Sequence, residues 1–149
     1  MNEKQLREHL QALHMPALGI AYVIQAATTD PAKTVFHGNR QSVAGEYHSS
    51  IPTCLDDAPR HWRLQFTARS TEYAFIVDLE SRSQALLLLD QPSSVSLDIT
   101  NARGRRQRIT YTADFLVVEG DRVRVVECKT REDALKLVKD KPRSWIEDG

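Results

Sequence analysis

The chain has 149 residues, of which 41% are hydrophobic and 27% are charged, which suits one soluble globular domain and leaves too little length for two. Lysine plus arginine and aspartate plus glutamate both number 20, so the net charge indicates no particular partner. The longest apolar run, residues 85–89, is far shorter than the ~18 residues of a membrane span, and the mixed charges of the N-terminus exclude a secretory signal.

The first half of the chain predicts few regular elements. Residues 3–13 carry leucines at helical spacing and predict a short amphipathic helix. Residues 18–24 fit a strand as well as a helix, and both interpretations stay open. Residues 28–60 are rich in Thr, Ser, Gly, Pro and Asp, which predicts irregular structure with one or two short strands.

The pattern becomes more regular in the middle of the chain. Residues 62–68 predict a strand, and residues 70–80 predict a helix with one apolar stripe. Residues 85–89 either continue this helix or lead out of it. Gln91-Pro92 ends the segment, because proline restricts the residue before it.

Strands are expected next over residues 95–100, 107–118 and 122–129. The last predicted element is a helix over residues 131–140, with Leu135 and Val138 directed inward. This order predicts an α/β or α+β fold with a central mixed β-sheet flanked by helices. We expect a single domain, 1–149, with a partly irregular extension over 1–60 and a core over 62–140. The two cysteines form no disulfide framework, which favours a reduced cytosolic compartment.

The turn pair Gly120-Asp121 predicts a hairpin whose pairing brings charged residues together. A glycine in the first position of a two-residue loop is a favoured chemistry, and such a loop places residues opposite each other when their numbers sum to 241. Asp114 then faces Glu127. Because side chains alternate along a strand, Lys129 lies on the same face as both acids.

Two carboxylates with Cβ atoms ~5 Å apart repel each other unless a cation lies between them. Lys129 is one candidate for that cation, and a divalent metal is the other, since Mg²⁺ takes carboxylate oxygens together with water and phosphate. Two acids and a lysine suit a metal-assisted attack on a phosphodiester. Equally, Asp114, Glu127 and Lys129 fit the solvated end of an ordinary hairpin with a surface salt bridge.

Glu72 adds a further acid from a separate element. It shares the apolar stripe of the 70–80 helix with Phe75, Ile76 and Leu79, and an inward carboxylate is rarely left without a partner. It is therefore a candidate third ligand or water-holding group. The alternative is a glutamate that only complements the dipole at the helix start.

Residues 103–108 carry four arginines and no acid. Such a run fits a solvated loop, and it also fits a patch that binds phosphate. The candidate DNA-backbone contacts are Arg40, Arg103, Arg105, Arg106 and Arg108. Contacts of this kind give affinity that falls with salt and little sequence preference.

The order of these residues resembles the PD-(D/E)xK nuclease core, in which a helix glutamate precedes an aspartate and a Glu-x-Lys pair. The segments S-T-E-Y-A-F-I at 70–76, Y-T-A-D-F-L at 111–116 and E-C-K at 127–129, with Gln91-Pro92 and the basic turn at 103–106, resemble the TnsA-like endonuclease subunit of heteromeric transposases. The resemblance covers roughly residues 35–140, including the S-V-A-G-E-Y run near Arg40.

The resemblance implies a restriction-endonuclease-like core that nicks double-stranded DNA at transposon 5′ ends with Mg²⁺, or with Mn²⁺ in its place. It implies catalytic roles for Glu72, Asp114, Glu127 and Lys129, of which the three acids would bind metal. The implied partners are a DDE-type transposase and an ATPase regulator, in the bacterial cytoplasm at the nucleoid and without a membrane.

Two positions depart from the family pattern, since Ala113 and Thr130 stand where proline is usual. Members also often continue beyond the point where this chain ends, which is compatible with a truncated chain. Two other functions stay open, a restriction or repair nuclease on the same core and a non-catalytic DNA-binding or scaffolding subunit.

Overall fold

A computed structural model describes residues 1–28, 45–55, 63–66, 69–82, 84–100 and 103–140. Within these ranges the helices are α1 (Glu3–Ala12), α2 (Ala17–Thr28), α3 (Ala74–Arg82) and α4 (Arg131–Asp140), and a π-helical turn, η2 (Arg69–Tyr73), leads into α3. The strands are β1 (Gly45–His48), β2 (Arg63–Phe66), β3 (Ala85–Asp90), β4 (Val95–Thr100), β5 (Arg106–Tyr111), β6 (Phe115–Glu119) and β7 (Val123–Val126). None of the helices in the described part is long and apolar enough to cross a membrane.

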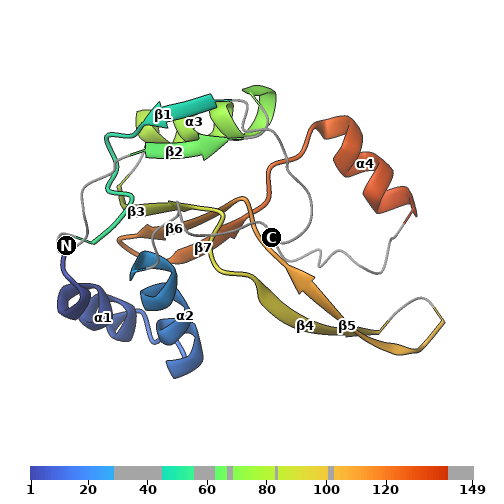
Figure 1. Ribbon diagram of the computed structural model, residues 1–149, viewed down its shortest axis with the longest axis horizontal. Coiled ribbons are helices and arrows are strands. Elements are labelled where there is room, and N and C mark those ends of the chain that lie inside the picture. Colours follow the sequence, from blue (N-terminus) through green and yellow to red (C-terminus); the bar gives the residue numbers. More distant parts are fainter. Residues whose placement is uncertain (29–44, 56–62, 67–68, 83, 101–102, 141–149) are drawn as a thin grey trace.

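The centre of the molecule is the three-stranded antiparallel sheet β3-β6-β7, in which β6 is the middle strand. All five residues of β6 are buried. Figure 1 shows the sheet between two layers, with α1 and α2 on one side and α3 with the β1-β2 hairpin on the other. A strand buried on both faces is expected to be apolar throughout, and Phe-Leu-Val-Val has that character.

Alternating side chains of the sheet supply two separate cores. Leu116 and Val118 point toward α1 and α2, where they pack with residues such as Leu10 and Val23. Phe115 and Val117 point the other way, into a cluster that includes Ile76 of α3. The N-terminal helices therefore cover one face of β3 and β6, while Val125 on the same face of β7 is 57% exposed.

The described strands do not form the single central mixed sheet expected from the sequence. They form the three-stranded sheet and two separate pairs, β1-β2 and β4-β5, and every pairing is antiparallel. A parallel neighbour needs a long crossover, and α3, the helix between strands, joins β2 and β3 of different sheets. The coarser expectation, a mixed α+β protein, is confirmed.

Two elements differ from the sequence-based expectation in type or length. Residues 85–89 belong to strand β3, since their leucines pair with β6 instead of continuing α3. The single strand expected over 107–118 is broken at Thr112–Asp114 into β5 and β6. Residues 18–24, left open by the sequence, lie in helix α2.

The orientation expected for Leu135 is wrong. Its side chain is 60% exposed, because α4 projects beyond the end of the sheet and does not lie on it (Figure 1). The side chain of Val138 lies outside the described residues. The helices expected over residues 3–13 and 131–140 are confirmed as α1 and α4.

The predicted hairpin register is confirmed within the strands, where pairing ends at Phe115 with Val126, one step before the expected pair of Asp114 and Glu127. Val118 pairs with Val123 and Leu116 pairs with Val125, while the Glu119 N–H donates to the Arg122 carbonyl at 2.8 Å across the two-residue loop. The turn chemistry differs from the expectation, because Gly120 is not in the left-handed region. A Cβ at Gly120 would meet no atom within 4 Å.

We expect Gly120→Ala to leave the free energy of unfolding within about 0.5 kcal/mol of the original, because the position needs neither positive φ nor empty space. Phe115→Ala, which removes a fully buried ring from the middle strand, should cost about 3–5 kcal/mol. Urea unfolding of both variants measures the difference. A loss of more than about 1 kcal/mol in Gly120→Ala would contradict this account of the turn.

Candidate functional site

Asp114 lies in the break between β5 and β6, at the end of the sheet opposite the Gly120 turn. Its main chain continues the sheet, since its N–H donates to the Val126 carbonyl at 3.1 Å and its carbonyl accepts from the Gln91 N–H at 2.8 Å. The carboxylate accepts the Cys128 N–H at 2.6 Å. Backbone pairing on both sides therefore fixes the direction of this side chain.

The surroundings of Asp114 disfavour the charged form of its carboxyl group. Burial raises the pKa of its carboxyl group, and the nearby Glu127 and Glu72 raise it further, while the Cys128 N–H and Lys129 oppose the shift. Desolvation and like charges both favour the protonated acid. An added cation would relieve both effects.

Glu127 and Lys129 follow β7 directly and form an ion pair. The Lys129 ammonium lies 2.5 Å from Glu127 Oε1, and Tyr111 donates its hydroxyl to Oε2 at 3.0 Å. The hydrogen bond to Glu127, the largest effect, raises the pKa of Lys129. Burial, followed by the bond to Glu127, raises the pKa of Tyr111 to about 12.

Glu72 reaches this end of the sheet from η2, and its side chain is only 6% exposed. Phe75 stacks on Phe115 with ring centroids 5.2 Å apart, which seats the helix on the sheet at this point. The charge of Glu72 contributes to the raised pKa values of Asp114 and Asp90. The expectation that Glu72 faces inward is therefore confirmed, and a π-helical turn carries it, a form often found at functional sites.

Asp90 is a fourth acid here that the sequence analysis missed. It ends β3 opposite Phe115, and its carboxylate accepts the Gln65 N–H of β2 at 2.8 Å. Burial is the main cause that raises its pKa to about 6, and Glu72 adds to it. The available signal was an acid that directly follows a run of four leucines, at the end of a buried strand.

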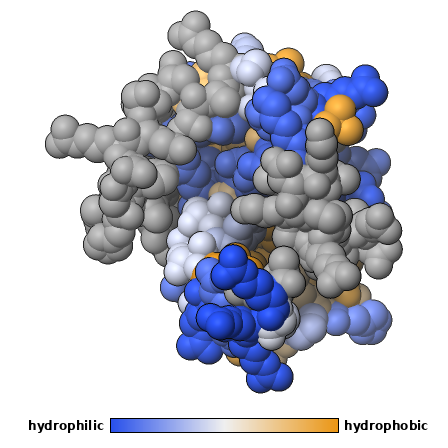
Figure 2. Space-filling view, turned by 90° about the vertical axis from the view of Figure 1, so that its right-hand side faces the viewer, coloured by the Kyte–Doolittle hydropathy of each residue, from blue (hydrophilic) through white to orange (hydrophobic). Residues whose placement is uncertain are grey.

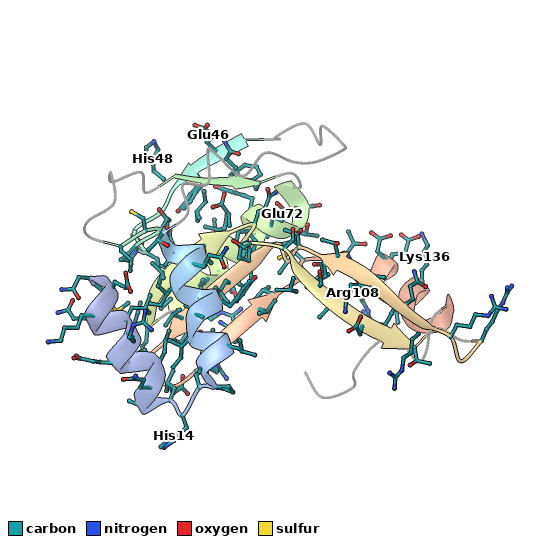
Figure 3. The ribbon with its side chains drawn as sticks, turned by 60° about the horizontal axis from the view of Figure 1, so that its bottom comes forward. His14, Glu46, His48, Glu72, Arg108 and Lys136 are labelled. Carbon is teal, nitrogen blue, oxygen red and sulfur yellow. The ribbon has the colours of Figure 1, made fainter. Side chains whose placement is uncertain are left out.

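We call the end of the sheet that carries Glu72, Asp90, Asp114 and Glu127 the carboxylate corner. Cys128 shows how strongly negative it is. Burial and then the charges of Asp114, Glu72 and Glu127 raise the pKa of its thiol to about 12. Three carboxylates from separate parts of the chain thus influence one atom. Figure 3 shows Glu72 where the β4-β5 hairpin meets the body of the molecule.

The donor chemistry of this corner suits Mg²⁺, which prefers carboxylate oxygens. In the part of the chain that the structure describes, no three His, Cys, Asp or Glu side chains form a group that could hold a metal ion. Mg²⁺ commonly uses one or two carboxylates and completes its shell with water and substrate phosphate. Asp114 and Glu72 are candidates for that role, and Glu127 would enter it with both oxygens already accepting hydrogen bonds.

The arginines expected to contact DNA do not all lie in one environment. Arg103, Arg105 and Arg106 are exposed at the tip of the β4-β5 hairpin. Arg108 is exposed farther down β5, where its guanidinium pairs with both carboxylate oxygens of Asp98 at 2.9 and 3.1 Å. Arg40 lies outside the described residues.

Glu80, the other acid of this helix, lies away from the corner. Its carboxylate accepts hydrogen bonds from the Tyr47 hydroxyl, the Ser49 hydroxyl and the Ser50 N–H. Burial raises the pKa of Glu80, but these donors together lower it below its ordinary value. Through these hydrogen bonds Glu80 holds the end of β1 against α3, which is a structural role.

Comparison of the chain with known protein families and with curated proteins finds no match.

The pKa of Asp90 predicts a measurable pH dependence of stability. Between pH about 4 and about 6 the folded protein keeps a proton that the unfolded chain releases, so this group makes the free energy of unfolding fall as pH rises through that window. Asp90→Asn should remove this fall and stabilise the protein at pH 7 by about 1–3 kcal/mol. Urea unfolding from pH 4 to 8 measures it.

The raised pKa of Asp114 acts in the same direction and remains in the variant, so only the difference between the two proteins reports Asp90. A difference that is constant from pH 4 to 7 would contradict the assignment.

Proposed function

We propose that the protein is a metal-dependent DNA endonuclease that hydrolyses phosphodiester bonds. The observation that supports this proposal is the convergence of Glu72, Asp114 and Glu127 beside Lys129 at one end of the sheet. Burial, together with the like charges of Glu127 and Glu72, raises the pKa of Asp114, a cost that binding of a cation would offset. Clusters of this type are common where charge is needed for catalysis.

Asp114 and Glu72 would hold Mg²⁺ or Mn²⁺ in this proposal. The metal would neutralise phosphate charge and lower the pKa of bound water. The Cys128 N–H keeps Asp114 in one orientation, and the stacking of Phe75 on Phe115 keeps Glu72 against the sheet. Positioning of this kind is a large part of what a protein contributes to such a reaction.

Lys129 acts as a cation in this scheme. Its raised pKa keeps the ammonium protonated at neutral pH, which makes it a poor base and a good partner for negative charge on the transferred phosphate. Glu127 holds the ammonium in place, and Tyr111 in turn holds Glu127. Glu127 is then a positioning residue as well as a candidate ligand.

The more specific part of the proposal is a TnsA-type subunit that cleaves transposon 5′ ends within a restriction-endonuclease-like core. It rests on the order of Glu72, Asp114 and Glu127-Cys128-Lys129 along the chain and on the β6-β7 hairpin, beyond whose last pair the Cys128 N–H donates to Asp114. The partners in that case are double-stranded transposon ends, a DDE-type transposase and an ATPase regulator. A restriction or repair nuclease would use the same residues.

One observation favours a second candidate, a DNA-binding or scaffolding subunit without catalysis. Glu127 is fully engaged by Lys129 and Tyr111, and the described residues hold no group of three metal-binding side chains. The internal hydrogen bonds of the carboxylate corner could hold these side chains in place without a bound metal ion. Cleavage and metal binding separate the two candidates.

Asp114→Asn should reduce nicking of supercoiled plasmid by at least about 100-fold in the presence of Mg²⁺ or Mn²⁺, because it removes a charge and keeps an oxygen for the Cys128 N–H. The assay contains the transposase partner, if gene context supplies one. Asp121→Asn is the matched control, since Asp121 is exposed at the other end of the same hairpin. Its rate should be unchanged.

Equal nicking by Asp114→Asn and the original protein would overturn the site assignment. Absence of nicking by the original protein under every metal and partner condition would favour the scaffolding candidate. Calorimetric titration with Mn²⁺ alone adds a readout that does not need turnover. In that titration Asp114→Asn should lose binding that Asp121→Asn keeps.

A further inference from the structure

The β4-β5 hairpin stands out from the rest of the molecule as an arm, defined here by its described residues Val95–Thr100 and 103–111. Its six cross-strand pairs run from Val95 with Tyr111 to Thr100 with Arg106, and neither strand pairs with another sheet of the described chain. Figure 1 shows it projecting from the body beyond the three-stranded sheet. At ~3.4 Å per residue, the paired part is roughly 17 Å long.

The two faces of the arm differ in character. One face carries Val95, Leu97 and Ile99 with Ile109 and Tyr111, and the other carries polar residues, including the paired Asp98 and Arg108. Most of these side chains are exposed or only half-buried. Figure 2 views the molecule from this side, and its coloured surface is mostly hydrophilic.

The tip of the arm concentrates positive charge. Arg103, Arg105 and Arg106 are all exposed there, around Gly104, whose φ of 75° lies in the left-handed region that glycine adopts without strain. The arm holds four arginines and one aspartate, a net charge of +3, while the whole chain has none. Charge of one sign is therefore segregated onto a projecting element.

The base of the arm, which we call its root, is formed by Ser93, Ser94, Tyr111 and Thr112. It makes hydrogen bonds to the body of the molecule and to the candidate site. Tyr22 of α2 donates its hydroxyl to the Ser93 carbonyl at 2.8 Å, and the hydroxyls of Ser94 and Thr112 lie 2.5 Å apart. Tyr111, the last residue of the arm, donates to Glu127. The arm is thus joined to α2 through Ser93, just before β4, and to the carboxylate corner through Tyr111, the last residue of β5.

We propose that the arm is a DNA-holding element, which grips the duplex backbone with Arg103, Arg105 and Arg106 while its root at Tyr111 keeps the duplex beside the carboxylate corner. The proposal rests on the proposed function in taking DNA as the substrate. Guanidinium groups bind phosphate through paired hydrogen bonds, and a two-stranded ribbon has the dimensions that the major groove of DNA admits.

An acidic protein would satisfy the same arginines, but DNA fits the whole arrangement better. A negative corner repels an acidic surface, whereas a phosphodiester with its metal ion would bring a further cation to the corner beside Lys129. Tyr111, at the end of the arm, donates a hydrogen bond to Glu127, so a ligand that lies along the arm also reaches that corner. The charge pattern therefore favours a ligand that extends from the tip to the root.

The test measures binding without cleavage, by fluorescence anisotropy of a labelled duplex of about 30 base pairs in EDTA, across a range of salt concentrations. The variant Arg103→Ala/Arg105→Ala/Arg106→Ala should bind at least about tenfold more weakly at moderate salt. Each lost phosphate contact lowers the salt dependence of log K by about 0.9, so its slope should fall by between about 2 and 3.

The control variant Lys4→Ala/Arg7→Ala/Arg82→Ala removes the same charge from α1 and α3, where each residue pairs with an acid four residues away. It should bind DNA nearly as well as the original protein. Equal weakening in both triple variants would mean that net charge alone matters, and would overturn the proposal. So would an unchanged affinity in the arm variant.

A parallel titration with labelled polyglutamate tests the acidic-protein alternative. Tighter binding of polyglutamate than of DNA, lost in the arm variant, would overturn the proposal in favour of that partner. The proposed nuclease activity fails separately, because a protein that binds DNA through the arm and never nicks it keeps this inference and loses the other. A nuclease that cleaves normally without the arm arginines does the reverse.

Discussion

The antiparallel pairing of β6 with β7, closed by a two-residue loop, is the constraint on which the rest of the structure depends. It holds β6 between two layers of packed side chains, so that neither core can shift without the other. It also carries the register to the far end of the hairpin, where Asp114 bonds to Val126 and Cys128 and where Glu127 and Lys129 leave the strand. Slipping by one residue would turn every one of these side chains to the other face.

The charged corner forms where the regular pairing stops. Most residues inside the sheet are apolar, and the acids lie at the strand ends, with Asp90, Asp114 and Glu127 at one end and Glu119, which pairs with Arg122 and Arg124, at the other. The end of a sheet allows side chains to approach one another without losing backbone hydrogen bonds, since the N–H groups of Gln65 and Cys128 then serve the carboxylates. The carboxylates that repel one another are thus gathered at one end of these strands, while Glu119 at the other end is paired with two arginines.

The sequence predicted the parts of this arrangement that depend on local rules. A turn pair and the alternation of a strand are enough to set Val118 against Val123, and helical spacing is enough to direct Glu72 inward. Asp90 was missed because its position depends on β3 pairing with β6 and on the approach of β2, contacts between segments that lie far apart in the chain. Leu135 was placed wrongly for a related reason, since an apolar stripe shows which face a helix would bury and not whether a surface lies beneath it.

The arm has a consequence for how the chain folds. It is an excursion between β3 and β6, which are themselves antiparallel partners, so Asp90 and Phe115 must meet across 24 intervening residues. When Val95 has already paired with Tyr111, only the short links 91–94 and 112–114 remain to be ordered. By the logarithmic dependence of closure entropy on loop length, this reduces the cost of joining β3 to β6 by about 1 kcal/mol. Because neither strand of the arm pairs with another described sheet, the register of β3 with β6 does not depend on the length of the arm.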